Sequence, residues 1–261
     1  DELALIQKAV DICGQAQIRA LKACKPGMYE YELEADIRHE FVKHGAMHVS
    51  FEPIIAGGAN ACTLHYGANN QKLNDGDLVL VDIGCEYDYY ASDLTRMFPV
   101  SGKFSPEQKA IYELVLEAQC AAIEKIGPKY AVGDAHNASV EVITRGLCQL
   151  GILQGDEETL IKAEAYKPFY MHHVGHWMGL DAHDVGEYYI DGKGRPLQPG
   201  MIQTAEPGIY ISPHTSGVDK KWWGIGVRIE DDVLVTQDGH KVLSSAVPKT
   251  VNEIENMKVT K

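Results

Sequence analysis

The sequence predicts an α+β fold made of two similar halves, each with helices ahead of its strands. Helical periodicity opens both halves, whereas short apolar runs separated by glycine and proline fill their later parts. An internal echo supports the repeat, since Gly76 precedes Asp82 by six positions across an apolar run and Gly200 precedes Glu206 by six across another. We therefore expect one domain over residues 1–261, with halves at about 1–127 and 128–261 whose acidic residues face each other.

Two amphipathic helices are predicted at the beginning of the chain. The first covers residues 2–24, where apolar side chains recur at helical spacing until Lys25-Pro26-Gly27. The second covers residues 30–44 and stops at Gly45.

Strands are predicted next, because the period of the apolar residues changes. Residues 51–67 mix short apolar runs with glycines, which indicates strands and turns. After a turn at 74–77, the continuous run LVLV indicates a buried strand that leads directly into Asp82. A second acid, Asp93, follows eleven residues later beyond a tyrosine-rich turn, so a hairpin can bring both acids to one end of a sheet.

A second helical stretch follows. Ser105-Pro106-Glu107-Gln108 is a strong helix start, and this helix should reach Ile126 before Gly127-Pro128. Asp134 can cap a further helix to about Leu150. The remaining predictions are a short helix at about 156–164, strands and loops from Phe169 onward, strands near 226–236 and 240–246, and a short helix near 251–257.

Charge and composition argue against several classes of function. The formal net charge is −13 at pH 7, which disfavours a general nucleic-acid binder. No apolar run approaches the roughly 18 residues of a membrane span, and we expect no secretory signal. The six cysteines form no CxxC pair, which disfavours a cysteine zinc site and favours reduced thiols in a cytoplasmic compartment. In a eukaryote, the mitochondrial matrix is the alternative location.

The most unusual stretch is MHHVGHWMGLDAHDVG at residues 171–186. It contains four histidines within twelve residues: His172, His173, His176 and His183. A single histidine is more often a hydrogen-bonded structural group, but this density favours metal or substrate binding. His172 and His176 would share one face of a helix, yet Gly175 and Gly179 disfavour a regular helix, and the glutamate of an HExxH zinc motif is missing.

Acidic residues are the candidate partners of this cluster, although each also has an ordinary structural interpretation. Asp82 can be a strand-end acid that faces water. Glu206 lies in TAEPG, where the following Pro-Gly imposes a sharp turn. Glu230 lies in VRIEDD, where strict alternation places Arg228 and Glu230 on one face, and such a row is usually a set of solvent-facing ion pairs.

Taken together, four carboxylates and one imidazole suit two divalent cations such as Mn²⁺, Co²⁺, Fe²⁺, Mg²⁺ or Zn²⁺. Four negative charges balance two divalent ions, so such a cluster can be buried without a large net charge. Two metals about 3.5–4 Å apart can share a water and lower its pKa enough to yield hydroxide near neutral pH. The remaining histidines could then bind or protonate a substrate.

The same residues resemble the "pita-bread" metallopeptidases, which include aminopeptidase P, prolidase, methionine aminopeptidase and creatinase. The resemblance is strongest to the Xaa-Pro aminopeptidase catalytic domain and covers nearly the whole chain. It is carried by LHY at 64–66, VDIG at 81–84, SDLTR at 92–96, HHVGHWMGLDAHDVG at 172–186, EPGIY at 206–210 and GVRIEDD at 226–232. It implies the pita-bread fold, in which two pseudo-symmetric α+β halves form a curved, mainly antiparallel sheet with a dimetal site between them.

The resemblance also implies roles for individual residues. The metal ligands would be Asp82, Asp93, His176, Glu206 and Glu230, with Asp93 and Glu230 bridging the two ions. His65 would contact substrate near the scissile bond, His172 would stabilise the tetrahedral intermediate, and His183 would bind the substrate backbone. Arg228 and Tyr210 would line the pocket on the proline side. The family cofactor is usually two Mn²⁺ ions, although other divalent ions can substitute.

The implied reaction is hydrolysis of the first peptide bond of a peptide whose second residue is proline. A metal-bridging hydroxide would attack the carbonyl, and Glu206 would be the proton shuttle. Such a bond needs a dedicated enzyme, because the proline nitrogen carries no N–H and the ring fixes the backbone. The implied partners are peptide substrates, and a homo-oligomer is the expected assembly. Family members of this subgroup normally carry an additional N-terminal domain, so we expect that this chain is either a shortened piece or a short form.

Three alternatives stay open. The first is a prolidase that cleaves only Xaa-Pro dipeptides. The second is a methionine aminopeptidase, which the arginine in VRIED disfavours. The third is a non-catalytic peptide-binding module on the same fold, which is disfavoured because all five implied metal ligands are present.

Overall fold

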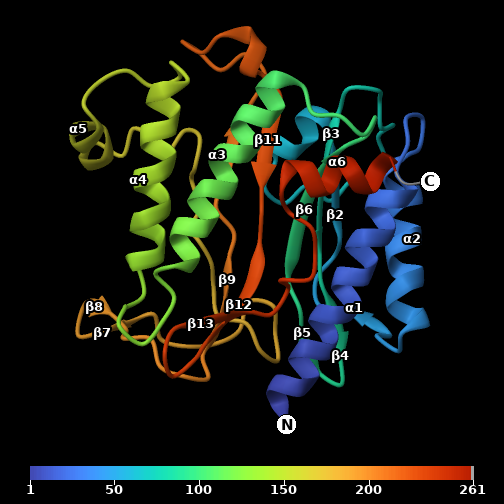
Figure 1. Ribbon diagram of the computed structural model, residues 1–261, viewed down its shortest axis with the longest axis vertical. Coiled ribbons are helices and arrows are strands. Elements are labelled where there is room, and N and C mark those ends of the chain that lie inside the picture. Colours follow the sequence, from blue (N-terminus) through green and yellow to red (C-terminus); the bar gives the residue numbers. More distant parts are fainter. Residues whose placement is uncertain (260–261) are drawn as a thin grey trace.

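The computed structural model describes residues 1–259, and helices and strands follow one another largely as the sequence predicts (Figure 1). The helices are α1 (Glu2–Ala23), α2 (Glu30–Lys43), α3 (Pro106–Ile123), α4 (Asp134–Gln149), α5 (Glu157–Lys162) and α6 (Val251–Val259), with 3-10 helices η1 (Gly58–Cys62) and η2 (Lys220–Trp222). The strands are β1 (His48–Val49), β2 (Ile54–Gly57), β3 (Leu78–Ile83), β4 (Cys85–Tyr87), β5 (Tyr90–Ala91), β6 (Leu94–Pro99), β7 (Tyr189–Ile190), β8 (Lys193–Gly194), β9 (Ile202–Ala205), β10 (Gly208–Ile211), β11 (Ile225–Arg228), β12 (Asp231–Val235) and β13 (His240–Val242). The predicted α+β class is confirmed.

Two three-stranded antiparallel sheets form the centre of the molecule, in the orders β2-β3-β6 and β13-β12-β9. In the first sheet Asp82 lies opposite Thr95, and in the second Asp231 lies opposite Ala205. The sheets meet where the backbone N–H of Glu230 donates to the carbonyl of Thr95 at 3.1 Å. Each sheet therefore pairs a strand that ends near one acid with a later strand that begins beside a second acid, which is the arrangement that the internal echo predicted.

Pairs of helices cover the sheets. α1 packs against α2, and α3 packs against α4, while α6 contacts both α1 and α3 (Figure 1). In the view of Figure 1, α3 and α4 lie over the strands on the left and α1 and α2 lie on the right. The apolar faces of these helices and strands share one large core cluster, which includes Leu33 and Phe98 from the first part of the chain and Ile143 and Ile209 from the second.

Helix beginnings show where local sequence rules held and where they did not. The hydroxyl of Ser105 accepts from the N–H of Gln108 at 3.2 Å, and the side chain of Gln108 accepts in return from the N–H of Ser105, so the predicted cap is confirmed. The predicted Asp134 cap is wrong. Gly133 occupies the cap position with φ 104°, a conformation that favours glycine, and the Asp134 carboxylate instead accepts from the N–H of Ala131 at 2.8 Å.

Three strand or helix boundaries differ from the prediction. In the segment 51–67 only β2 is a strand, and η1 and a loop follow it. The single strand predicted at 226–236 is broken, because β11 pairs with β10 whereas β12 pairs with β9, so the chain changes partners at Ile229–Glu230. α3 ends at Ile123 rather than Ile126.

Two further findings concern cysteines and membranes. All six cysteines lie in the described part of the chain, and each is a free thiol. Within residues 1–259, no helix combines the length and apolar character that crossing a bilayer would require.

Candidate metal centre and active site

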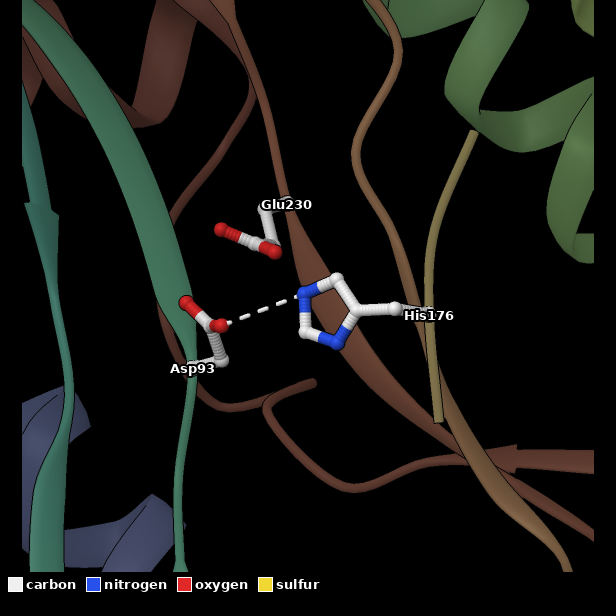
Figure 2. A group of neighbouring side chains, drawn as sticks. All are labelled: Asp93, His176 and Glu230. Carbon is white, nitrogen blue, oxygen red and sulfur yellow. Dashed lines mark ion pairs between the residues drawn. The ribbon is translucent and has the colours of Figure 1, made fainter. Parts of the chain in front are cut away.

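Three side chains from distant parts of the sequence converge at the junction of the two sheets. Asp93 lies between β5 and β6, Glu230 lies between β11 and β12, and His176 lies in the irregular segment 171–186. Their carboxylate and imidazole groups point toward one another (Figure 2), and one potential ligand atom from each lies within 4.8 Å of the others. Nε2 of His176 is 3.4 Å from Oδ2 of Asp93.

Two more acids complete the cluster. Oε1 of Glu206 lies 3.3 Å from Nε2 of His176. Asp82, near the end of β3, is buried, and its Oδ2 accepts from Nη2 of Arg228 at 2.5 Å. Its Oδ1 is buried without a hydrogen-bond partner among the described residues. All five residues expected to be ligands line the same cavity.

The backbone of the histidine segment is held against β9. The N–H of Thr204 donates to the carbonyl of His176 at 3.0 Å, and the N–H of Glu206 donates to the carbonyl of Val174 at 2.7 Å. Gly175 makes this approach feasible, because a Cβ at that position would lie 2.0 Å from the carbonyl oxygen of Thr204. The glycine that argued against a helix is therefore required for the segment to lie beside the strand.

A backbone contact determines which nitrogen of His176 bonds the main chain and which faces the acids. Nδ1 of His176 lies 3.1 Å from the carbonyl oxygen of Trp177. A carbonyl can only accept, so Nδ1 carries a proton and Nε2 is the nitrogen that faces the acids. Nε2 donates to them when the ring is protonated, and it offers its lone pair to a cation when that proton is lost.

Without bound cations, the negative charges of the neighbouring carboxylates repel one another. Burial raises the pKa of Asp93 to about 7, even though the hydrogen bond from His176 opposes this change. Burial and the nearby carboxylates of Asp93, Glu206 and Asp82 raise the pKa of Glu230 well above its usual range. Two divalent cations would offset the four carboxylate charges and would give the unpartnered oxygen of Asp82 a partner. The donor set therefore fits a dimetal site.

Neighbouring hydroxyl groups fix the orientation of two of the acids. Oγ1 of Thr95 donates to Oε2 of Glu230 at 2.7 Å, and Oγ1 of Thr204 donates to Oε1 of Glu206 at 3.2 Å. Sequence reasoning assigned neither threonine a role. Thr95 lies inside the motif SDLTR, so its closeness to Asp93 was the available signal.

A chain of hydrogen bonds connects the acids of the cluster to His172. Nη1 of Arg228 donates to the hydroxyl of Tyr210 at 2.9 Å, and that hydroxyl lies 2.9 Å from Nε2 of His172. The glycine of EPG leaves room for this hydroxyl, since a Cβ at Gly208 would lie 2.4 Å from the Tyr210 oxygen. Tyr210 is buried behind His172 and Arg228, so it supports the wall of the cavity and is not itself among the lining residues.

The interpretation of VRIEDD as a solvent-facing row is wrong. Arg228 and Glu230 are only 4% and 2% exposed. The face that they share is covered by the first sheet, where Asp82 accepts from Arg228 and Thr95 donates to Glu230.

His65 and His183 reach the same cavity from exposed segments. His65 follows η1, and the ring of His183 packs on that of His176 with centroids 4.0 Å apart. Burial, with the neighbouring His176, lowers the pKa of His183. Neither histidine makes a side-chain hydrogen bond within the described residues, so both have ring nitrogens free for a ligand.

The cavity has a volume of about 1230 Å³ and extends well beyond the acids. Its far end is lined by residues from the beginning of α4 and from the segment before β8: Ala135, His136, Asn137, Tyr188 and Tyr189. The ring centroid of His136 lies 5.2 Å from that of His173. Sequence reasoning missed His136, because a lone histidine in a helix carries no motif.

The chain is similar to known metallopeptidases. Residues 4–237 match the model of metallopeptidase family M24. The chain is 52% identical over 257 residues to the Xaa-Pro aminopeptidase of Haemophilus influenzae, covering 98% of this chain and 59% of the relative. It is 45% identical over 259 residues to the Xaa-Pro aminopeptidase of Escherichia coli, covering 99% and 58%. It therefore spans less than two thirds of the length of these relatives.

Solved structures agree with this similarity. The aminopeptidase PepP of Pseudomonas aeruginosa superimposes with a TM-score of 0.98 at 56% identity, covering 98% of this chain and 58% of that one. Aminopeptidase P from E. coli with the inhibitor Pro-Leu gives a TM-score of 0.96 at 45% identity, covering 99% and 58%. The expected pita-bread fold is confirmed.

Proposed function

The chain belongs to metallopeptidase family M24, and we propose from this premise that it is the catalytic part of an Xaa-Pro aminopeptidase. Such an enzyme hydrolyses the first peptide bond of peptides whose second residue is proline. The relatives that carry this name cover almost the whole chain at 45–52% identity, which supports the assignment.

One observation carries the proposal: a buried cluster of four carboxylates and one imidazole lies on the wall of a peptide-sized cavity. Two divalent cations would be held by Asp82, Asp93, His176, Glu206 and Glu230. Mn²⁺ is the proposed native ion, because a site made mainly of carboxylate oxygens suits hard cations. When bound, the pair of ions would polarise the scissile carbonyl and lower the pKa of a shared water.

Glu206 is the proposed proton acceptor. Its side chain is 17% exposed, compared with 6% for Asp93, so it is the more accessible of the two to a substrate and its water. Burial raises the pKa of Glu206, but the hydrogen bond and charge of His176 lower it overall, so the carboxylate is ready to accept a proton. Its orientation is fixed at Oε1, which accepts from the hydroxyl of Thr204.

Histidines and an arginine would position the peptide. His183 and His65 have free ring nitrogens beside the acids and would bind the substrate backbone near the scissile bond. His172 and Arg228 form the wall that would face the proline side. Because the proline nitrogen has no N–H, recognition must rely on shape and on the carbonyl groups that flank it.

Peptides longer than a dipeptide are the proposed substrates. Pockets for small ligands usually measure about 300–1,000 Å³, whereas this cavity measures about 1230 Å³ and continues past His172 to His136. The volume favours the aminopeptidase over a prolidase, which needs space for two residues only.

Domain organisation, location and assembly are proposed as follows. Residues 1–261 act as one catalytic domain with two related halves, as the shared core supports. The protein is cytoplasmic, in keeping with its free cysteines. It forms a homo-oligomer, which exposed apolar residues near the cavity support: Leu180, Val185 and Tyr189.

The direct test measures the hydrolysis of three peptides by the protein, first after its metal has been removed and then after Mn²⁺ has been added back. We expect metal-dependent cleavage of Xaa-Pro-Yaa and no cleavage of Xaa-Ala-Yaa. Cleavage of the dipeptide Xaa-Pro alone would identify a prolidase. A protein that binds peptides but neither binds divalent metal nor hydrolyses any of them would be the non-catalytic module.

A further inference from the structure

A fully buried carboxylate outside the metal cluster holds the loop that carries His65. Glu30 is the first residue of α2 and is 0% exposed. Its carboxylate accepts four hydrogen bonds, from the N–H of Gly57 at 2.9 Å, Nδ2 of Asn60 at 3.0 Å, the hydroxyl of Tyr66 at 2.8 Å and the N–H of Gln71 at 2.8 Å. All four donors belong to one stretch of chain, residues 57–71.

The part of this stretch that follows η1 has little structure of its own. Within the described chain, no N–H or carbonyl of residues 64–70 takes part in a backbone–backbone hydrogen bond. The same stretch contributes Leu64 and His65 to the wall of the cavity. The position of His65 therefore depends on side-chain contacts on both sides of it. These are the contacts of Glu30 and those of the buried Asn69, whose side chain bonds Ile55, Pro53 and Glu34.

Glu30 suits this task for two physical reasons. A carboxylate has about four lone-pair sites, and each oxygen of Glu30 accepts two of the four donors. In addition, the positive end of the α2 dipole stabilises a negative charge in the first helical turn. The Glu30 side chain thus joins the helix start to the loop, in addition to the backbone bond from the N–H of Glu30 to the carbonyl of Gln71 at 2.9 Å.

We propose that Glu30 is a positioning residue that acts on peptide hydrolysis through His65. It touches neither the acids nor the cavity, and Tyr66, one of its four donors, directly follows His65 in the chain. The inference rests on the proposed function, since His65 is a substrate-contacting residue only if the protein cleaves peptides.

The test uses Glu30→Gln, which preserves shape but replaces one accepting oxygen by an NH₂ group that cannot accept from two of the donors. Because small displacements of positioned groups cost up to about 100-fold in rate, we expect kcat/KM for Xaa-Pro-Yaa to fall about 10–100-fold. Mn²⁺ affinity, measured by calorimetry, should stay unchanged. The matched control is Glu32→Gln, which also removes a first-turn acid of α2. Among residues 1–259, the Glu32 carboxylate accepts only from the N–H of Tyr29.

A double-mutant cycle with His65→Ala separates positioning from a general loss of structure. If Glu30 acts through His65, Glu30→Gln should change kcat/KM by less than about 3-fold in the His65→Ala background, because coupled sites are not additive. An equal fall in both backgrounds, or no fall in the wild-type background, overturns the proposal. Tyr66→Phe removes a single bond and should give a smaller loss in the same direction.

Hydrogen exchange keeps this inference distinct from the proposed function. The amides of Gly57 and Gln71, which donate to Glu30, should exchange faster in Glu30→Gln than in Glu32→Gln, whether or not any peptide is cleaved. Unchanged exchange would overturn the inference, whereas an inactive wild-type protein that passes the exchange test would instead overturn the proposed function.

Discussion

The hydroxyl of Tyr210 lies 2.9 Å from Nε2 of His172, and the surrounding contacts determine which atom holds the proton. Nδ1 of His172 lies 2.8 Å from the carbonyl of His173, so Nδ1 is protonated. Burial lowers the pKa of His172, which favours the neutral ring. Nε2 is then an acceptor, and Tyr210 donates to it. In this state His172 has no free N–H for an oxyanion, so its implied role in stabilising the tetrahedral intermediate requires Nε2 to exchange its partner when substrate binds.

Removing the Tyr210 hydroxyl should therefore impair both activity and stability. Tyr210→Phe leaves Nη1 of Arg228 and Nε2 of His172 without this partner, and each unsatisfied buried group costs about 1–3 kcal/mol. For the two groups together we expect unfolding free energy to fall by about 2–6 kcal/mol and kcat/KM to fall about 10-fold. Urea denaturation and peptide hydrolysis measure the two effects. Tyr89→Phe, at a site that is 78% exposed, is the control and should change neither. An active, fully stable Tyr210→Phe would show that the hydroxyl contributes nothing.

The sequence was informative wherever chemistry is concentrated in a short motif. The acids at 82, 93, 206 and 230 and the histidine segment were found from spacing and from the resemblance, and the structure brings their side chains to one cavity. Gly175 was correctly taken as evidence against a helix, although its closeness to Thr204 could not be read from a single segment.

Contacts between distant segments could not be predicted in the same way. Thr95 acts on Glu230 across 135 positions, and Arg228 contacts Asp82 across 146. The single strand predicted at 226–236 is broken because the chain changes partners at Ile229–Glu230, which depends on two other strands and not on local sequence. His136 joins the cavity only because α4 begins there.

The proton-acceptor role predicts the effect of Glu206→Gln. The substitution preserves shape but removes a negative ligand and the accepting carboxylate, so kcat should fall by at least about 100-fold, the lower range for general-base contributions. The circular dichroism spectrum should stay native. Glu187→Gln, at another acid that lines the cavity, is the control and should retain activity. Turnover close to wild type in Glu206→Gln would assign proton transfer to a different group.

Metal binding should stabilise the fold, because cations bind the assembled carboxylates and not the unfolded chain. At 100 times the dissociation constant, a ligand contributes about 2.7 kcal/mol, which corresponds to a rise in Tm of about 5–10 °C for a chain of this size. Differential scanning calorimetry with and without Mn²⁺ measures this rise. Asp93→Asn should reduce it strongly, since Asp93 lies at the centre of the cluster. An equal rise in both proteins would place the bound metal elsewhere.

A buried ion pair beside the metal cluster should matter far more than an exposed one. Asp231 is fully buried and accepts from Nη2 of Arg96 at 2.7 Å and from Nζ of Lys249 at 2.6 Å. Asp231→Asn leaves these cations without their charge partner, which costs about 3–5 kcal/mol. Arg145→Gln breaks a surface pair with Glu117 and should cost less than about 1 kcal/mol. Urea titration of both variants decides the comparison, and similar losses would contradict it.

His136 lies at the far end of the cavity and should make the free energy of unfolding depend on pH. Burial, followed by the nearby charges of His173, His172 and Lys167, lowers the pKa of His136 from 6.5 to about 4. Between these values the unfolded chain binds a proton that the folded chain excludes, so the free energy of unfolding falls as pH decreases from 6.5 to 4. A shift of this size corresponds to at most about 3 kcal/mol, and we expect about 1–2 kcal/mol because the imidazole is partly exposed to solvent.

His136→Asn removes the titrating group and should flatten this part of the stability curve. The informative quantity is the difference in the free energy of unfolding between metal-free wild type and metal-free variant. Every other group titrates in both proteins, so its contribution cancels in this difference. Wild type should lose about 1–2 kcal/mol more than the variant between pH 6.5 and 4 and nothing more above pH 7. Gln15→Asn, an exposed substitution that removes no titrating group, is the control and should leave the curve parallel to wild type. If His136→Asn is also parallel, the imidazole is protonated in the folded chain, and the far end of the cavity carries a positive charge at acidic pH.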